Sequence, residues 1–165
     1  TYSKKTFSPQ RYEIWTMQSG WHNLPQFDPD GAKYDQQPGA AFAAADVTVT
    51  DALDGLAMDL APAYGSVPGL GRYRRSVHLT DTGLTLCDET DYPGTVALTL
   101  MSVEKPAVDG DTVAFGALAA AAVTGADKIV TEAVPITDPR LRQAWPDTLY
   151  RTRIYFTQQL SLVIE

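Results

Sequence analysis

The chain has 165 residues, a length that suits one domain with a sizeable hydrophobic core. It carries 20 acidic and 13 basic residues, for a formal net charge of -7. This excess of acidic residues argues against nucleic acid and against an acidic membrane surface as partners, because a protein that binds either of them needs clustered Lys and Arg. No apolar run approaches the roughly 20 residues that span a bilayer, so no membrane partner is expected.

Alternation of apolar and polar residues with period two dominates the sequence, which is typical of strands with one face on a core. Turn-forming residues such as Asp54-Gly55 and Pro93-Gly94 separate these runs at regular intervals. Strands joined by such turns predict an all-β fold, an antiparallel β-sandwich with at most one or two short helical turns. The alternating runs are residues 47–50, 84–87, 96–101 and 160–164.

Four local elements have weaker signals. The aromatic-rich run at 11–18 is expected to be extended up to the Ser-Gly break that follows it. A hairpin turn is predicted at Gly83, with the glycine supplying a positive φ. The alanine-rich segment 116–125 has helical propensity, but its bounding glycines and neighbouring strands favour a strand. A helical turn is predicted at 138–145, where Asp138 can cap and the next residue is proline.

Histidine and cysteine side chains give few candidates for chemistry. Cys87 is the only cysteine, so no intrachain disulfide or thiolate cluster can form, and it is interpreted as a half-buried structural thiol. His78 alternates with apolar neighbours and is expected on a solvated strand face. His22 follows a chain bend, and it is either a satisfied structural histidine or a site residue. No HExxH or CxxC spacing accompanies it, so it cannot form a zinc site alone.

Basic residues occur in pairs that would share a strand face. Arg72 and Arg74 form one such pair, and Arg151 and Arg153 form another. Each pair could hold a carboxylate or sulfate, or could lie on a solvated face with local ion pairs. Trp21 and its aromatic neighbours could stack on sugar rings, although core packing is the commoner role of such residues.

At this point the sequence resembles a known family. The stretch RYEIWTMQSGWHNLP at 11–25 resembles an R…S-x-x-H-N stretch in the C-terminal sandwich of heparinase II/III-like polysaccharide lyases. Members pair an N-terminal helical toroid with a supersandwich-like β-domain. Further runs that agree in order are residues 39–44, 60–64, 72–77, 88–89 and 135–151.

The resemblance implies that residues 1–165 are one β-sandwich domain, a C-terminal fragment of a larger, bacterial toroid-plus-sandwich lyase. Such lyases cleave uronate-containing polysaccharides by β-elimination. Their catalytic residues lie in the toroid and in a segment upstream of this one, so no catalytic residue is expected in this chain and the fragment is expected to be inactive. The implied partners are an acidic polysaccharide and the toroid of the same protein.

The same resemblance assigns roles to a few residues. His22 matches a histidine that completes a metal site in some members, with zinc as the cofactor of the full-length parent and none expected on the fragment. Asn23 matches its neighbour, which fixes the turn or the imidazole. Substrate binding is predicted for Asn23 and, from the chemistry of their own side chains, for Trp21, Arg72 and Arg74. The alternatives are a non-catalytic carbohydrate-binding module and a scaffold that braces a toroid.

Overall fold

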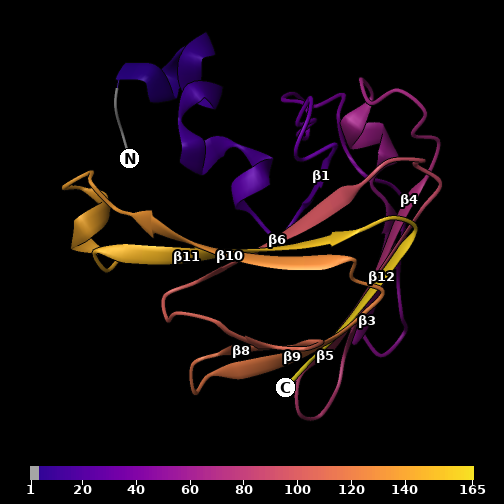
Figure 1. The fold of residues 1–165 in the computed structure, drawn as a ribbon. Coiled ribbons are helices and arrows are strands. Elements are labelled where there is room, and N and C mark those ends of the chain that lie inside the picture. Colours follow the sequence, from indigo (N-terminus) through magenta and orange to yellow (C-terminus); the bar gives the residue numbers. More distant parts are fainter. Residues whose placement is uncertain (1–3) are drawn as a thin grey trace.

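Two antiparallel sheets pack face to face over residues 4–165, the part of the chain that the computed structural model describes (Figure 1). This arrangement confirms the predicted all-β sandwich. The four-stranded sheet has the order β1 (Pro25–Phe27), β6 (Val96–Ser102), β11 (Thr148–Phe156) and β10 (Lys128–Pro135). The eight-stranded sheet has the order β2 (Ala45–Val49), β3 (Gly55–Asp59), β4 (Tyr73–Leu79), β5 (Leu84–Thr90), β12 (Gln159–Ile164), β9 (Ala119–Thr124), β8 (Thr112–Phe115) and β7 (Ala107–Asp109).

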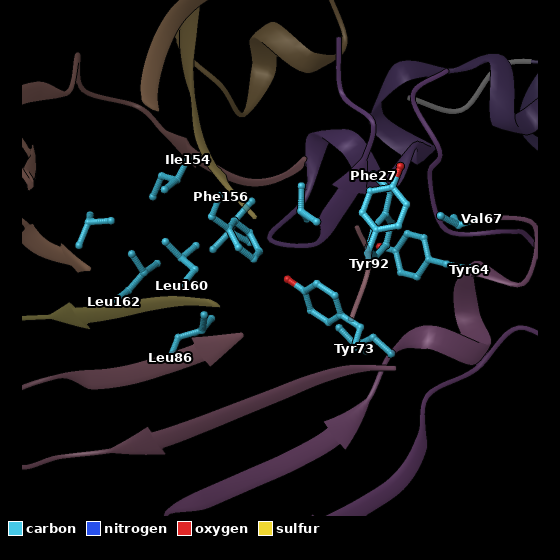
Figure 2. Packing of buried hydrophobic residues seen from close by; sticks show 14 of the residues in the cluster. Phe27, Tyr64, Val67, Tyr73, Leu86, Tyr92, Ile154, Phe156, Leu160 and Leu162 are labelled. Atoms are coloured by element: carbon cyan, nitrogen blue, oxygen red, sulfur yellow. The ribbon is translucent and has the colours of Figure 1, made fainter. Parts of the chain in front are cut away.

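The core lies between the inner faces of the two sheets, and burial alternates along strands such as β4 and β9, whereas β2 is largely exposed. Figure 2 shows Ile154 and Phe156 of β11 facing Leu160 and Leu162 of β12. At one end of the core the buried ring of Phe27 is the centre of an aromatic cluster, with edge contacts to three tyrosine rings. The centroid distances are 4.9 Å to Tyr64, 5.5 Å to Tyr73 and 5.2 Å to Tyr92.

Short 3-10 helices form a third layer outside the four-stranded sheet. Residues 4–21, drawn in indigo in Figure 1, form η1 (Lys4–Phe7), η2 (Pro9–Glu13), η3 (Trp15–Met17) and η4 (Ser19–Trp21). The extended run predicted at 11–18 is therefore wrong. Pro9 starts η2, and the Ser8 hydroxyl caps it by accepting from the Gln10 N–H at 3.2 Å.

The number of helical turns is also larger than the sequence predicted. With η5 (Ala61–Tyr64) and η6 (Leu141–Gln143), residues 4–165 contain six 3-10 helices and no α-helix. η6 lies within the turn predicted at 138–145, and Asp138 accepts the Arg140 N–H at 2.8 Å. None of the helices in this part of the chain is long and apolar enough to cross a membrane.

Several local predictions are confirmed. The alanine-rich segment forms β9, and the glycines on either side of it, Gly116 and Gly125, have φ of +63° and +86°. Cys87 is half-buried on β5, with its Sγ 3.4 Å from the Ser161 hydroxyl. His78 is exposed on β4.

Gly83 has a different role from the one predicted, because its φ is not positive. A Cβ added at this position would lie 1.8 Å from the carbonyl oxygen of Ile164 in β12. The β4–β5 turn therefore needs glycine because the backbone at Ile164 passes too close to leave room for a side chain. A special backbone conformation is not the reason.

Replacing Gly83 with alanine is expected to lower the free energy of unfolding by about 1–3 kcal/mol, because the new methyl group forces the Ile164 carbonyl away. Urea unfolding followed by fluorescence measures this change. Gly110→Asn is the control, since Gly110 has φ +54°, which asparagine tolerates, and no atom lies within 4 Å of an added Cβ. Equal midpoints for the two variants would contradict the close-approach explanation.

Candidate functional site: a tryptophan groove held by a buried ion pair

All three tryptophans of the sequence meet in one surface cavity beside the four-stranded sheet. The ring centroids of Trp15 and Trp21 lie 5.0 Å apart in an edge contact, and those of Trp15 and Trp145 lie 6.0 Å apart. The cavity has a volume of about 300 Å³. We call it the tryptophan groove; its lining residues are Trp15, Thr16, Trp21, His22, Asn23, Met101, Trp145 and Leu149.

The η-layer brings two of these indoles together. Trp15 starts η3 and Trp21 ends η4, and the two helices are separated only by Gln18, whose backbone is extended with φ -92° and ψ 135°. The Gly20 carbonyl, next to Trp21, accepts from the Thr99 hydroxyl of β6 at 3.1 Å, which ties η4 to the outer face of the sheet. Trp145 follows η6, 124 positions after Trp21 in sequence, so no local pattern connects the two.

Arg151 of β11 lies directly beneath Trp21. Its guanidinium carbon is 3.8 Å from the centroid of the Trp21 ring, a cation–π contact. The same side chain donates to the Glu132 carboxylate on the neighbouring strand β10 and to the Gly20 carbonyl at 3.3 Å. These contacts occupy the guanidinium, so Arg151 orients the indole and is not a free anion-binding group.

His22 is exposed at the edge of the groove. Its Nε2 atom lies 3.1 Å from the carbonyl oxygen of Thr16. A carbonyl only accepts hydrogen bonds, so this contact needs the hydrogen on Nε2 and leaves Nδ1 as the acceptor of the neutral ring. No group of three or more His, Cys, Asp or Glu side chains that could hold a metal ion occurs in residues 4–165. His22 alone does not supply the donor set of a zinc ion.

A buried ion pair fixes the backbone that follows His22. Arg75 of β4 and Asp88 of β5 are directly paired in the sheet, and their side chains are only 7% and 0% exposed. Arg75 donates to both carboxylate oxygens, from Nε at 2.7 Å and from Nη2 at 2.6 Å. The Tyr73 hydroxyl donates to the same carboxylate at 2.6 Å. The remaining Arg75 nitrogen, Nη1, donates to the Asn23 carbonyl at 2.7 Å.

We call this set the Arg75–Asp88 network; it contains Tyr73, Arg75, Asp88 and the Asn23 carbonyl. A second hydrogen bond crosses the layers nearby, from the buried Tyr64 hydroxyl to the Pro25 carbonyl at 2.7 Å. The Tyr64 hydroxyl of η5 and the Arg75 guanidinium of β4 therefore hold the start of β1 from inside the sandwich. The segment that carries His22 and Asn23 is thus fixed at the surface.

Burial changes the pKa of the groups in and beside this network. Burial disfavours the charged form of Arg75, but the hydrogen bonds and the charge of Asp88 outweigh it and raise the pKa of the guanidinium. Burial, followed by the negative charge of Asp88, raises the pKa of Tyr73 well above 10.0. Burial also raises the pKa of Tyr64 above 10.0. The arginine therefore stays charged and both phenols stay protonated.

The raised tyrosine pKa values predict a loss of stability in alkali. Above pH 10.0 the unfolded chain releases the phenolic protons of Tyr64 and Tyr73, whereas the folded chain retains them. The free energy of unfolding should then fall by about 1.4 kcal/mol per pH unit for each phenol, and this contribution is intact below pH 10.0. Urea midpoints measured at several pH values between 9 and 11.5 test this. Tyr73→Phe should make the fall shallower, and a slope equal to that of the parent chain would contradict the assignment.

The structure brings some of the predicted site residues together and separates others. Trp21, His22 and Asn23 all line the tryptophan groove. Arg72 and Arg74 do not: both are exposed, and Arg74 points away from the core because its neighbours on β4 point into it. Arg74 lies on the outer face of the eight-stranded sheet, on the other side of the sandwich, and Arg72 lies in the loop just before β4. Sequence reasoning had considered Trp15 for sugar stacking and Arg151 for anion binding, and it missed Met101, Trp145 and Leu149 of the groove.

No known protein family and no curated protein matches this sequence. The chemistry of the groove is therefore inferred from its own side chains. Indole faces stack on the apolar faces of sugar rings, while an amide and an imidazole exchange hydrogen bonds with hydroxyl groups. None of the lining residues is an aspartate, glutamate, lysine or arginine. This arrangement suits recognition of a sugar ring.

Proposed function

We propose that the chain is the C-terminal β-sandwich of a heparinase II/III-like polysaccharide lyase, and that its tryptophan groove binds a sugar unit of a uronate-containing polysaccharide. The observation that carries the proposal is the Arg75–Asp88 network. Of the six stretches on which the resemblance to the lyase family depends, four lie together here although they are far apart in sequence, at 11–25, 60–64, 72–77 and 88–89. Each of them contributes a residue to this network or to the hydrogen bond beside it.

This convergence gives the four stretches one shared physical task. Asn23 belongs to the first stretch, Tyr64 to the second, Arg75 to the third and Asp88 to the fourth. Together they hold the His22–Asn23 segment against the sandwich while both residues face the groove. A pocket that is completed by another part of a longer protein needs this kind of rigid support. Its residues must already be held in the geometry that binding requires, and a loosely held segment would first have to be ordered.

In this proposal residues 4–165 bind and orient the sugar, and the groups that carry out the elimination belong to other parts of the longer protein. Proton abstraction beside the uronate carboxylate and protonation of the leaving oxygen need groups from a toroid and from an upstream segment. The toroid of the same protein is the proposed macromolecular partner, and the acidic polysaccharide is the substrate. A zinc ion in the longer parent would take His22 as one ligand, through the Nδ1 atom that the Thr16 contact leaves free.

A second candidate is a carbohydrate-binding sandwich without catalysis. The observation in its favour is that the aromatic walls of the groove are complete within residues 4–165. This candidate predicts similar affinity for neutral and acidic oligosaccharides, because no free cation lines the groove. In the lyase proposal the preference for acidic polymers is a property of the longer protein, because its toroid would supply the cations that the groove lacks.

The 165-residue chain itself provides the test. Oligosaccharides of heparosan, chondroitin, alginate and cellulose are added, and binding is followed by tryptophan fluorescence and calorimetry. Absorbance of unsaturated uronates is recorded in parallel. We expect saturable binding of at least one acidic series and no unsaturated product. Product formation would place catalysis in this chain, and a lack of binding to all four series would remove the sugar-binding role.

A further inference from the structure

A second cavity, of about 360 Å³, opens between the two sheets. It lies where the end of β6 faces the β8–β9 turn and the end of β12, on the side where Figure 1 shows β8 and β9 standing apart from the four-stranded sheet. Its walls are mostly apolar: Leu100, Val103, Phe115, Leu118, Ala119 and Ile164. We call this cavity the apolar slot.

The slot and the tryptophan groove adjoin one another. Asn23 and Met101 line both cavities. Asn23 is fixed at this junction, since its carbonyl accepts from the buried Arg75. A polar, aromatic site and an apolar site therefore meet at a rigid residue that carries a side-chain amide.

We infer that the apolar slot binds an alkyl or acyl chain attached to the sugar that the groove holds. This inference rests on the proposed sugar-binding role of the groove. The volume of the slot is in the range of small-molecule sites, and burying a chain there would remove apolar surface of both partners from water. Glu104 is the one charged residue of its lining, and its carboxylate disfavours a free fatty acid. A neutral chain joined to the sugar as an ester, amide or glycoside suits the slot.

The test uses a series of alkyl β-glucuronides with methyl, butyl, hexyl and octyl chains, below their micelle concentrations. Calorimetry with the 165-residue chain measures the dissociation constants. We expect affinity to rise roughly two- to fourfold with each methylene beyond butyl. Leu118→Asp should remove this dependence and leave the affinity for methyl glucuronide unchanged. Ala119→Phe, which fills the slot, should do the same.

Leu53→Asp is the matched control, because Leu53 is 78% exposed and Leu118 is 76% exposed. Leu53 lies on the β2–β3 turn, at the opposite end of the eight-stranded sheet, so this variant should keep the full dependence on chain length. A dependence that survives in Leu118→Asp overturns the inference. So does dimer formation driven by octyl glucuronide in sedimentation, which would make a second copy the occupant.

The two proposals fail in different ways. If methyl glucuronide binds but the affinity does not depend on chain length, the slot inference is overturned and the sugar-binding role stands. If methyl glucuronide and the longer members all fail to bind, both are overturned. If the longer members bind but Trp21→Ala leaves their affinity unchanged, the slot is independent of the groove and the attachment to a bound sugar is wrong.

Discussion

Replacing Asp88 with alanine is expected to lower the free energy of unfolding by about 3–5 kcal/mol. The reason is that Asp88 is fully buried and is the one anion among residues 4–165 that the Arg75 guanidinium contacts. Removing the carboxylate leaves a positive charge in the core without its partner, and it also takes the acceptor from the Tyr73 hydroxyl. For a domain of this size the thermal midpoint should drop by roughly 6–20 °C.

Calorimetry and urea unfolding measure the effect, and three variants define its cause. Tyr73→Phe removes one hydrogen bond and should cost about 1–2 kcal/mol. The double variant Arg75→Met, Asp88→Leu should recover much of the loss, since apolar residues can replace a buried pair when both charges are removed. Asp147→Ala is the control. Asp147 forms an ion pair with Arg142, and its side chain is 78% exposed. This substitution should change the midpoint little, because water screens an exposed pair.

A small effect for Asp88→Ala would contradict the role of the network as the support of the His22–Asn23 segment. A second readout separates this local role from general stability. In Tyr73→Phe, which should stay folded, the amide resonances of residues 22–24 should broaden or shift, while those of the distant strands β8 and β9 should not.

The strands could be predicted because their signal is local. Each alternating run has one apolar face, and the turn residues between runs mark where a strand must end. The small-residue strand at 119–124 was also predictable, since the glycines at 116 and 125 limit the segment to a length too short for a stable helix.

The N-terminal run was predicted wrongly because its aromatic content was interpreted as strand propensity. The run forms separate short 3-10 helices, and Gln18 between η3 and η4 is extended, so no single helical period passes through residues 15–21. Each turn is closed by its own backbone hydrogen bond, such as that from the Gln18 N–H to the Trp15 carbonyl at 3.1 Å. Short turns of this kind have too few residues to leave a periodic signal in the sequence.

The rest of the site depends on pairing that a single sequence does not contain. Arg75 lies two positions from Tyr73 and two from Val77, so the period of a strand places it on their inward-facing side. That its partner is Asp88 follows from the register of β4 with β5. The place of Trp145 follows from the β10–β11 connection, and no local pattern specifies such long-range contacts.

Replacing Trp21 with alanine is expected to weaken oligosaccharide binding by at least about thirtyfold, equivalent to roughly 2 kcal/mol. Trp21 is held from two sides: its ring lies 3.8 Å from the Arg151 guanidinium carbon, and its centroid lies 5.0 Å from that of Trp15. Its loss removes one stacking surface and the support of a second. Calorimetric titration of each variant with the tightest-binding acidic oligosaccharide measures the change.

Arg74→Glu is the matching test on the other side of the sandwich. If Arg72 and Arg74 grip the polysaccharide, this charge reversal should abolish binding and Trp21→Ala should have little effect. If the groove binds the sugar, the outcomes are exchanged, and Arg74→Glu leaves the affinity nearly unchanged because Arg74 is exposed on the outer face of the eight-stranded sheet. Near-UV circular dichroism checks folding of both variants, since the coupled rings of Trp15 and Trp145 still report on the groove when Trp21 is absent. Binding that resists both substitutions would require a sugar site elsewhere on the molecule, because the groove and the arginine pair would then both be excluded.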